Sequence, residues 1–210
     1  MGFTALANQI FKACIGDYHK TDDIHAQLRN PYPKGTIEHL LYLKNGIDTL
    51  QWHLEDRIRD PDIPAEEALQ IKRRIDELNQ QRTDTVEYID HWFLQKYAAV
   101  IPDKDAKINT ESPAWAVDKL SISALKIYHM RIEATREGAS ENHKRRAREK
   151  LAVLLAQRRD LCQSIEELLA DLGAGKKITK VYKQMKMYND AALNPVLYSR
   201  KSASRKNTPK

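Results

Sequence analysis

Hydrophobic residues recur every three or four positions along most of this chain, which predicts long amphipathic helices. Thr36, Ser112 and Ser140 each stand just before such a run, where their side chains can cap the first turn of a helix. Pro64 and Pro113 fall at the first helical position, which tolerates proline. The pattern predicts helices over residues 3–27, 37–59, 64–100, 113–137 and 140–172.

The breaks between these segments are rich in proline, glycine and polar residues. Residues 29–35 contain two prolines and a glycine, residues 60–64 form a turn, and residues 101–112 form a polar loop. Long helices joined by short connections favour antiparallel neighbours. The sequence therefore predicts an all-α fold: an up-down bundle of four long helices, an additional N-terminal helix and a short C-terminal helical segment. Within residues 176–198 we expect the short helical segment first and then an extended end over residues 193–198. We expect this bundle to be a single domain over residues 1–199.

Composition is consistent with a helical protein that folds without disulfides. Hydrophobic residues make up 41% of the 210 positions and charged residues 30%. Cys14 and Cys162 both lie in apolar helical patterns, so we expect reduced thiols that fill core space. The first residues lack the pattern of a secretory leader, and no run of about 18 apolar residues occurs. These observations predict a cytoplasmic protein that does not enter a membrane.

The net charge of +6 is concentrated at the C-terminal end. Residues 200–210 contain five basic residues and no acid, which leaves +1 for the rest of the chain. We expect this basic tail to be disordered. A nearly neutral body does not favour nucleic-acid binding, except for weak contacts made by the tail.

Two arginines fall where a helical bundle would place leucine. Arg82 lies in the middle of the apolar stripe of residues 64–100, and Arg158 in the middle of the stripe of residues 140–172. Arginine cannot lose its proton to escape burial, so each must pair with a carboxylate or face a ligand or water. Further polar residues follow the flank of Arg82, namely Asp76, Asn79, Glu87 and Asp90.

The segment 37–59 carries two apolar faces. One is a row of leucine and isoleucine, and the other mixes Leu41, Tyr42 and Trp52 with Asn45 and Asp56. A mixed face of this kind indicates a second, partly buried surface. It could be a pocket wall or an interface between copies of the chain, so a homo-oligomer is one of the two alternatives.

We interpret these polar positions as a site for a metal ion and a phosphorylated small molecule, such as a nucleotide. Carboxylates hold Mg²⁺ or Mn²⁺, and arginine grips phosphate oxygens. Asp76 and Asp90 lie 14 positions apart, or about 21 Å along a helix, so Asp56 can join only one of them. The predicted activity is metal-dependent hydrolysis or binding, with metal ligands among Asp56, Asp76, Glu87 and Asp90, catalytic roles for Asp56, Arg82 and Arg158, and ligand contacts from Asn45, Asn79 and Trp52.

Two alternatives stay open beside this hypothesis. The internal charges could form a buried ion-pair network that fixes helix register without any chemistry. The protein would then be a non-enzymatic adaptor that docks a partner through the Trp52 face or the tail. Among the histidines, His129 adjoins the apolar face of residues 113–137 and could join the interior polar group. His53 is predicted to make hydrogen bonds, and His19, His25 and His39 to serve as polar surface residues.

Several stretches together resemble a bacterial family known only as a domain of unknown function. The resemblance covers nearly the whole chain outside the tail and implies a cytoplasmic helical protein, without implying an activity. It is carried by Asn30-Pro-Tyr, by residues 41–56, 71–84, 118–130 and 182–190, and by Leu193-Asn-Pro195.

A second resemblance concerns the all-α nucleoside triphosphate pyrophosphatases of the MazG-like group. These enzymes bind Mg²⁺ with an E-x-x-E pair on one helix and an E-x-x-D pair on the next. Glu87-Tyr-Ile-Asp90 is similar to the second pair. The acids nearest to the first pair, Glu55, Asp56 and Asp60, do not give E-x-x-E.

Overall fold

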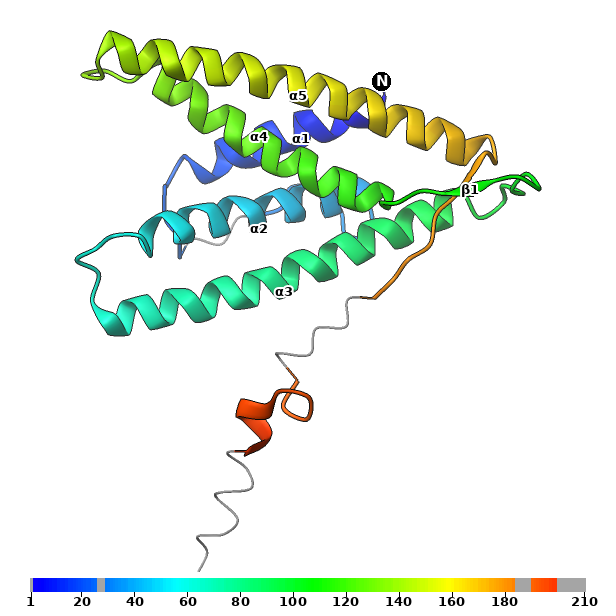
Figure 1. Ribbon diagram of the computed structural model, residues 1–210, viewed down its shortest axis with the longest axis horizontal. Helices are drawn as coiled ribbons and strands as arrows, with labels where there is room; N and C mark the ends of the chain where they lie inside the picture. The colour runs from blue at the N-terminus through cyan, green and yellow to red at the C-terminus, as the bar shows by residue number, and fades with distance from the viewer. Residues whose placement is uncertain (1, 26–28, 184–189, 200–210) are drawn as a thin grey trace, which may run out of the picture.

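The computed structural model describes residues 2–25, 29–183 and 190–199, and it is essentially all-α (Figure 1). The predicted fold class is confirmed, because long helices pack against one another over almost the whole described chain. In chain order the elements are α1 (Phe3–Tyr18), α2 (Ile37–Arg57), α3 (Ala65–Lys96), β1 (Lys107–Ile108), α4 (Pro113–Thr135), α5 (Glu141–Gly173) and β2 (Lys177–Ile178).

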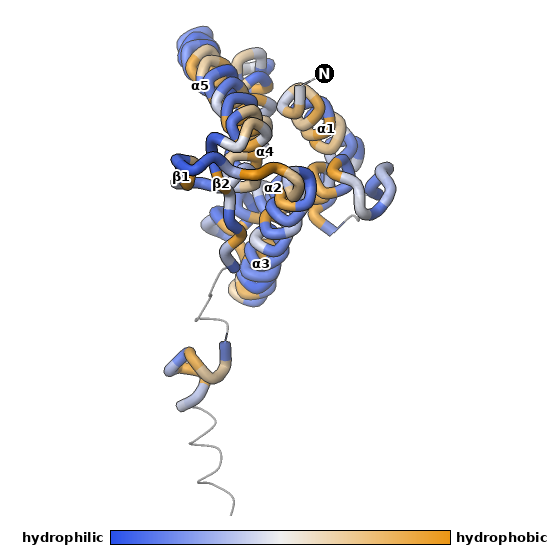
Figure 2. Tube along the Cα trace, turned by 90° about the vertical axis from the view of Figure 1, so that its right-hand side faces the viewer, coloured by the Kyte–Doolittle hydropathy of each residue, from blue (hydrophilic) through white to orange (hydrophobic). Residues whose placement is uncertain are grey.

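Helix α4 lies at the centre of the arrangement. It packs against α5 on one side and against α1, α2 and α3 on the other, whereas α3 and α5 do not touch. Seen nearly end-on in Figure 2, α5 and α3 lie at opposite margins with α4 and α2 between them and α1 beside them. The main core contains buried residues from all five of these helices, and a smaller core joins α2 to the first half of α3.

The predicted helix starts are confirmed by their capping bonds. Thr36, Ser112 and Ser140 each accept a hydrogen bond from the backbone N–H three residues later. The start of α4 has a second cap from a distant helix, because Asp90 of α3 accepts a hydrogen bond from the backbone N–H of Ala114 at 3.0 Å. A carboxylate at this end is stabilised by the free N–H groups and the dipole of α4.

Helix α1 is shorter than the sequence predicts. It ends at Tyr18 and not near residue 27. Asp22 adopts a left-handed backbone conformation with φ of 50°, which a helix cannot continue, and its N–H bonds the carbonyl of Tyr18. The turn that ends α1 therefore sets the position of His19, and this position matters for the site described below.

Two very short strands close the end of the bundle opposite to this turn. β1 and β2 pair in parallel, with Lys107 opposite Lys177. Two residues per strand are too few for a period-two pattern, so the sequence analysis did not anticipate them. Gly175 begins the approach to β2 with φ of 74°, and an added Cβ there would lie 2.8 Å from the carbonyl oxygen of Ile101. Glycine is thus required by the backbone conformation and by the neighbouring strand segment.

The α2 face with mixed apolar and polar residues is the buried one. Leu41, Tyr42 and Asn45 are almost completely inaccessible, whereas Leu43 on the leucine-rich face is 39% exposed. The leucine-rich face lines an open cavity of about 720 Å³ between α2, α3 and the α1–α2 connection. Asn45 therefore points into the bundle, whereas Asp56, farther along the same helix, is exposed.

The C-terminal part is described only in pieces. Residues 195–199 form one helical turn, whereas the sequence predicts an extended end over residues 193–198, so that prediction is wrong. The basic tail over residues 200–210, with its expected disorder and weak nucleic-acid contacts, lies outside the described residues. Within the described ranges, no helix combines the length and the apolar character needed to cross a membrane.

Candidate metal centre

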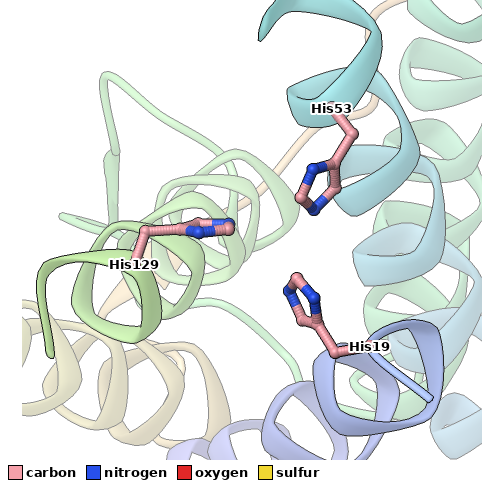
Figure 3. A group of neighbouring side chains, drawn as sticks. All are labelled: His19, His53 and His129. Carbon is pink, nitrogen blue, oxygen red and sulfur yellow. The ribbon is translucent and has the colours of Figure 1, made fainter. Parts of the chain in front are cut away.

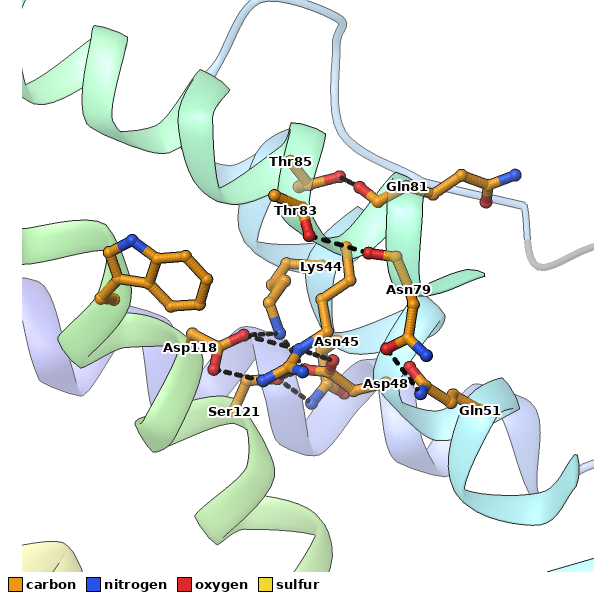
Figure 4. A network of polar contacts seen from close by, with 12 residues as sticks. Lys44, Asn45, Asp48, Gln51, Asn79, Gln81, Thr83, Thr85, Asp118 and Ser121 are labelled. Atoms are coloured by element: carbon orange, nitrogen blue, oxygen red, sulfur yellow. Dashed lines mark hydrogen bonds and ion pairs between the residues drawn. The ribbon is translucent and has the colours of Figure 1, made fainter. Parts of the chain in front are cut away.

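An ion-pair network from three helices occupies the middle of the bundle. Lys44 and Asp48, one turn apart on α2, pair with each other, and both side chains are fully buried. The Lys44 Nζ atom also lies 2.9 Å from Oδ1 of Asp118 on α4. Arg82 reaches in from α3 and donates to both oxygens of Asp118, over 2.8 Å from Nε and 2.5 Å from Nη2. Figure 4 shows the side chains of Lys44, Asp48 and Asp118 directed at one another.

The charges of this network are balanced within it, although Oδ1 of Asp48 and Oδ1 of Asn45 accept no hydrogen bond from the described residues. It holds two cations and two carboxylates, so its formal charge is zero. Ser121 donates to Oδ2 of Asp48 at 2.6 Å and accepts from Nδ2 of Asn45 at 2.9 Å. Burial raises the pKa of Asp118, but the charge of Lys44 and the hydrogen bond from Arg82 more than offset this, so its pKa lies below the usual range. The fork of Arg82 that could grip a phosphate is thus occupied by Asp118.

The structure brings together some of the predicted site residues. Trp52, Asp56 and Arg82 line one pocket of about 290 Å³, which Asp48 also borders. Asn79 lies nearby and accepts a hydrogen bond from Gln51, another residue of this pocket, at 3.0 Å.

Other predicted site residues lie apart from this pocket. Asp76 is exposed and pairs with Lys72 on its own helix. Asp90 is the buried cap of α4 described above, and burial raises its pKa. The backbone carbonyl of Glu87 accepts a hydrogen bond from His91 at 2.7 Å. Arg158 is half-exposed on α5, and the backbone of α5 does not closely approach α3, the helix that carries Arg82.

Three histidines from three helices converge at the end of the bundle where α1 terminates. His19 follows α1 directly, His53 lies on α2 and His129 on α4. One ligand atom from each ring lies within 4.8 Å of those of the other two. In Figure 3 the three rings point toward a common centre. All three Nε2 atoms are buried, and none has a hydrogen-bond partner in the part of the chain that the structure describes.

Each histidine ring is covered by an aromatic ring that belongs to another member of the cluster. The three histidines each follow an aromatic residue, in Tyr18-His19, Trp52-His53 and Tyr128-His129. Tyr18 stacks on His53 at 4.6 Å between ring centroids, Trp52 on His129 at 5.0 Å, and Tyr128 on His19 at 4.6 Å. The dipeptides thus interlock in a closed cycle. Because every ring is clamped by a neighbour, the cycle holds the nitrogen atoms facing inward.

Asp22 orients the first ring of this histidine cluster. Its Oδ1 lies 2.5 Å from Nδ1 of His19. An Nδ1–H donated to this carboxylate leaves the lone pair of His19 on Nε2, the atom that faces the other rings. Carboxylates that orient the histidine ligands of metal ions make the same contact. The left-handed conformation of Asp22, which ends α1, therefore also places a supporting carboxylate.

The surroundings of His53 and His129 favour neutral imidazole. Burial and the neighbouring His53 and His19 lower the pKa of His129 to about 4. Burial and His19 also lower the pKa of His53. The negative charge of Asp56, one turn after His53 on α2, acts in the opposite direction and raises the pKa of both rings, but by less. A neutral imidazole is the form that binds metal, so this group of three residues could hold a metal ion.

A metal fits the cluster after a small adjustment. Metal–nitrogen bonds of about 2.1 Å place three tetrahedral ligand atoms about 3.4 Å apart. The present separations, all within 4.8 Å, require side-chain rotations that move each nitrogen inward by about 1 Å. Three buried acceptors of one kind without partners are otherwise costly, because each has lost water without a compensating bond.

The sequence analysis missed this site. It treated His19 as polar surface and His53 as a hydrogen-bonding residue, and both lie in the cluster. One signal was present in the sequence: an aromatic residue precedes histidine at three positions only, and these are the three members of the cluster. The chain places them 34 and 76 positions apart, so no local spacing joins them.

The comparisons with known proteins identify the family but give no activity. A family model described as "Protein of unknown function (DUF4254)" matches residues 38–181, and the chain belongs to this family. This range contains His53 and His129 and begins after His19. No curated protein matches the chain, and no solved structure does, so the resemblance to nucleoside triphosphate pyrophosphatases gains no support.

Proposed function

We propose that this protein is a metal-dependent hydrolase whose centre is formed by His19, His53 and His129. The observation that carries the proposal is the convergence of the three rings, with one nitrogen of each within 4.8 Å of the others, together with three buried Nε2 atoms that no described residue hydrogen-bonds. Catalytic zinc sites commonly use three protein ligands and leave a fourth position for water or substrate. Structural sites more often use four protein ligands, and the cluster contains three.

The ligand set favours a different ion from the one that the sequence predicts. The expected Mg²⁺ or Mn²⁺ would need carboxylate oxygens. Imidazole nitrogen suits Zn²⁺, Ni²⁺, Cu²⁺ and Fe²⁺. Our proposal is therefore a borderline divalent ion, with Zn²⁺ as the reference case, and not a hard ion.

The neighbouring residues support hydrolysis. A divalent ion in this position lowers the pKa of a bound water to about 7 and polarises the substrate oxygen. Asp56 is exposed and lies one turn after His53, where its carboxylate can accept the proton that the water releases. Asp22 holds the ring of His19 in place. The remaining predicted partner, Arg82, supports α4 through Asp118.

We retain a phosphorylated small molecule as the substrate class. In the reaction, a water oxygen forms a bond to phosphorus and the bond from phosphorus to the leaving oxygen breaks. One proton of the water passes to Asp56 and the other stays on the phosphate. The leaving oxygen takes up a proton from solvent, and Asp56 then returns its proton to solvent. Asp56, which the sequence hypothesis names as a metal ligand, is thus proposed as a proton acceptor beside the three histidines.

Metal titration tests the centre directly. Isothermal titration of metal-free protein with Zn²⁺, Ni²⁺, Mg²⁺ and Mn²⁺ should give one tight site for the first two ions only. His53→Phe keeps an aromatic ring against Tyr18 and should lose this site. His91→Phe removes an exposed histidine on α3 and serves as the matched control. Tight binding that survives His53→Phe would place the metal elsewhere.

Turnover of p-nitrophenyl phosphate by the Zn²⁺-loaded protein tests the reaction. Asp56→Asn should keep Zn²⁺ binding and lose at least tenfold in kcat, because general-base assistance contributes about 10²-fold or more. Asp62→Asn, an exposed acid in the following turn, is the control. Equal rates for the wild type and Asp56→Asn would remove Asp56 from the mechanism, and no turnover above free Zn²⁺ would argue against a hydrolase of this substrate class.

A non-enzymatic adaptor is the second candidate. One observation favours part of it: the Lys44 network is neutral and internally paired, as a structural register device would be. That reading accounts for Arg82 but leaves the three inward-facing nitrogen atoms unexplained. The metal titration above separates the two candidates.

A further inference from the structure

A groove between α4 and α5 opens beside the histidine cluster. It has a volume of about 540 Å³, within the range of small-molecule sites. His129 and Trp52, which stack on each other, form part of its lining. It is thus bordered by the ring that presents its Nε2 atom to the cluster and by the aromatic residue that clamps this ring.

The groove combines an apolar surface with unpaired cations. Met130, Val153 and Leu154 contribute apolar side chains. Because α4 and α5 run antiparallel, Lys126 and Lys150 lie at a similar level along the hairpin, each twelve positions from Gly138 in the turn. Both lysines are exposed and enter no ion pair within the described parts of the chain. Glu133 also lines the groove, and its carboxylate contacts His143 and Arg136.

The surrounding helices are strongly basic. Residues 126–160 contain ten basic and five acidic residues, a net charge of +5. Residues 200–210 add +5, so the rest of the chain carries −4. The nearly neutral body is therefore polarised, with its positive side on the α4–α5 hairpin. A field of this sign concentrates anions at the groove.

We infer that the α4–α5 groove binds the substrate of the histidine centre, and that this substrate is an amphipathic phosphate. Its apolar body lies against Met130, Val153 and Leu154, and its anionic group is held by Lys126. The span from Lys126 to Glu133 along α4 is about 10 Å, which accommodates a short alkyl or aryl body. A nucleotide fits less well, because its polar base and sugar would lose water against an apolar surface. The inference rests on the proposed function of the histidine cluster.

Calorimetric binding of octyl phosphate to the Zn²⁺-loaded protein tests the groove. Octanol and inorganic phosphate supply the two halves of this probe separately. We expect octyl phosphate to bind at least tenfold more tightly than either, because only it uses both the apolar surface and the cation. Inorganic phosphate that binds as tightly as octyl phosphate would overturn the inference.

Matched variants locate the bound probe. Val153→Glu should weaken octyl phosphate binding at least tenfold, and it should leave the fold intact because Val153 is 57% exposed. Leu43→Glu makes the same change in the larger cavity between α2 and α3 and should have no effect. Lys126→Glu should weaken binding, whereas Lys12→Glu on α1 should not. A loss with Leu43→Glu in place of Val153→Glu would assign the probe to the other cavity and overturn the inference.

The absorption spectrum of Co²⁺-loaded protein connects the groove to the centre. Octyl phosphate should shift this spectrum in the wild type and leave it unchanged in Val153→Glu. Binding without a spectral change would overturn the role of the groove as a substrate site and leave metal binding intact. Failure of Co²⁺ and Zn²⁺ to bind at all would refute the proposed function, and the inference would fall with it.

Discussion

The bundle contains two interior groups of polar side chains, and they differ in how their members are satisfied. In the network around Lys44, every ionised group has an opposite charge within reach and the formal charge is zero. In the histidine cluster, three identical bases face one another and their Nε2 atoms have no partner. Both groups lie between α2 and α4, so the contrast does not arise from different surroundings of the helices.

This contrast distinguishes polar side chains that stabilise the fold from polar side chains that are available to bind a ligand. A closed network needs nothing further, and removing one member leaves a buried charge alone. An open cluster of lone pairs is completed by something that accepts all of them at once, which a metal ion does. Variants of the two groups should therefore fail in opposite ways: the network variants lose stability and keep metal, and the cluster variants keep stability and lose metal.

The largest effect is expected from Lys44→Met. It leaves Asp48 and Asp118 buried with Arg82 as their remaining cation, and breaking a buried pair in this way costs about 3–5 kcal/mol. Urea denaturation should show this loss in the free energy of unfolding, while the affinity of the folded protein for Zn²⁺ should stay within twofold of the wild type.

The double variant Lys44→Met/Asp48→Leu is the control for this prediction. It removes one cation and one carboxylate together, so it should be more stable than Lys44→Met alone. A cost below about 1 kcal/mol for Lys44→Met would show that the network does not hold the helices together.

The second effect is the loss of metal from His129→Phe. The phenyl ring can keep the stacking contact with Trp52, so the metal-free variant should unfold within about 1 kcal/mol of the wild type. Its affinity for Zn²⁺ should fall at least 100-fold, or about 2.7 kcal/mol, because one ligand of three is gone. Thermal denaturation with and without Zn²⁺ measures both, since bound metal raises the melting temperature of the wild type only. Destabilisation without a change in Zn²⁺ affinity would make the cluster structural.

The fold could be predicted from sequence to a larger extent than the site. Helical periodicity and capping residues such as Thr36 and Ser112 act within one turn, so they are visible locally and the structure confirms them. The buried face of α2 was harder to predict, because the face with the more regular leucines is the more exposed one. Tertiary packing against α1 and α4 selected the face with Asn45 instead.

The candidate site depended on contacts that periodicity cannot give. Arg82 was recognised as anomalous, but its partner Asp118 lies 36 positions away on another helix. The histidines looked ordinary because each one alone is a common residue near a helix end. What joins them is the interlocking of three aromatic–histidine dipeptides, and this requires the positions of α1, α2 and α4 together.

The third effect concerns the support of the cluster. Asp22→Asn removes the carboxylate charge beside Nδ1 of His19 and keeps its shape. Loss of such a partner costs about 10–100-fold in metal affinity. Asp23→Asn, at the next position, is the control, since Asp23 contacts only the backbone N–H of His25 among the described residues. Equal affinities for Asp22→Asn and Asp23→Asn would show that the left-handed turn alone positions His19.

The smallest effect is a difference in pH dependence between the two groups. The lowered pKa values of His53 and His129, the latter about 4, mean that the unfolded chain binds protons between pH 6.5 and 4 that the folded, metal-free protein does not. Its free energy of unfolding should therefore fall as the pH is lowered through this window, by about 1 kcal/mol, since solvent screens these half-buried rings.

The network should respond to pH in a separate range. The pKa of Asp118 lies below its ordinary value of 3.8, so its stabilising contribution is present above that pH and is lost as the pH falls through the lower, folded value. Urea midpoints of the metal-free protein measured from pH 7 to pH 3 should show a first decline that His129→Phe reduces and a second, at lower pH, that it leaves unchanged. A first decline of the same size in His129→Phe would mean that other groups titrate there, and that the histidines are not held neutral in the way the cluster requires.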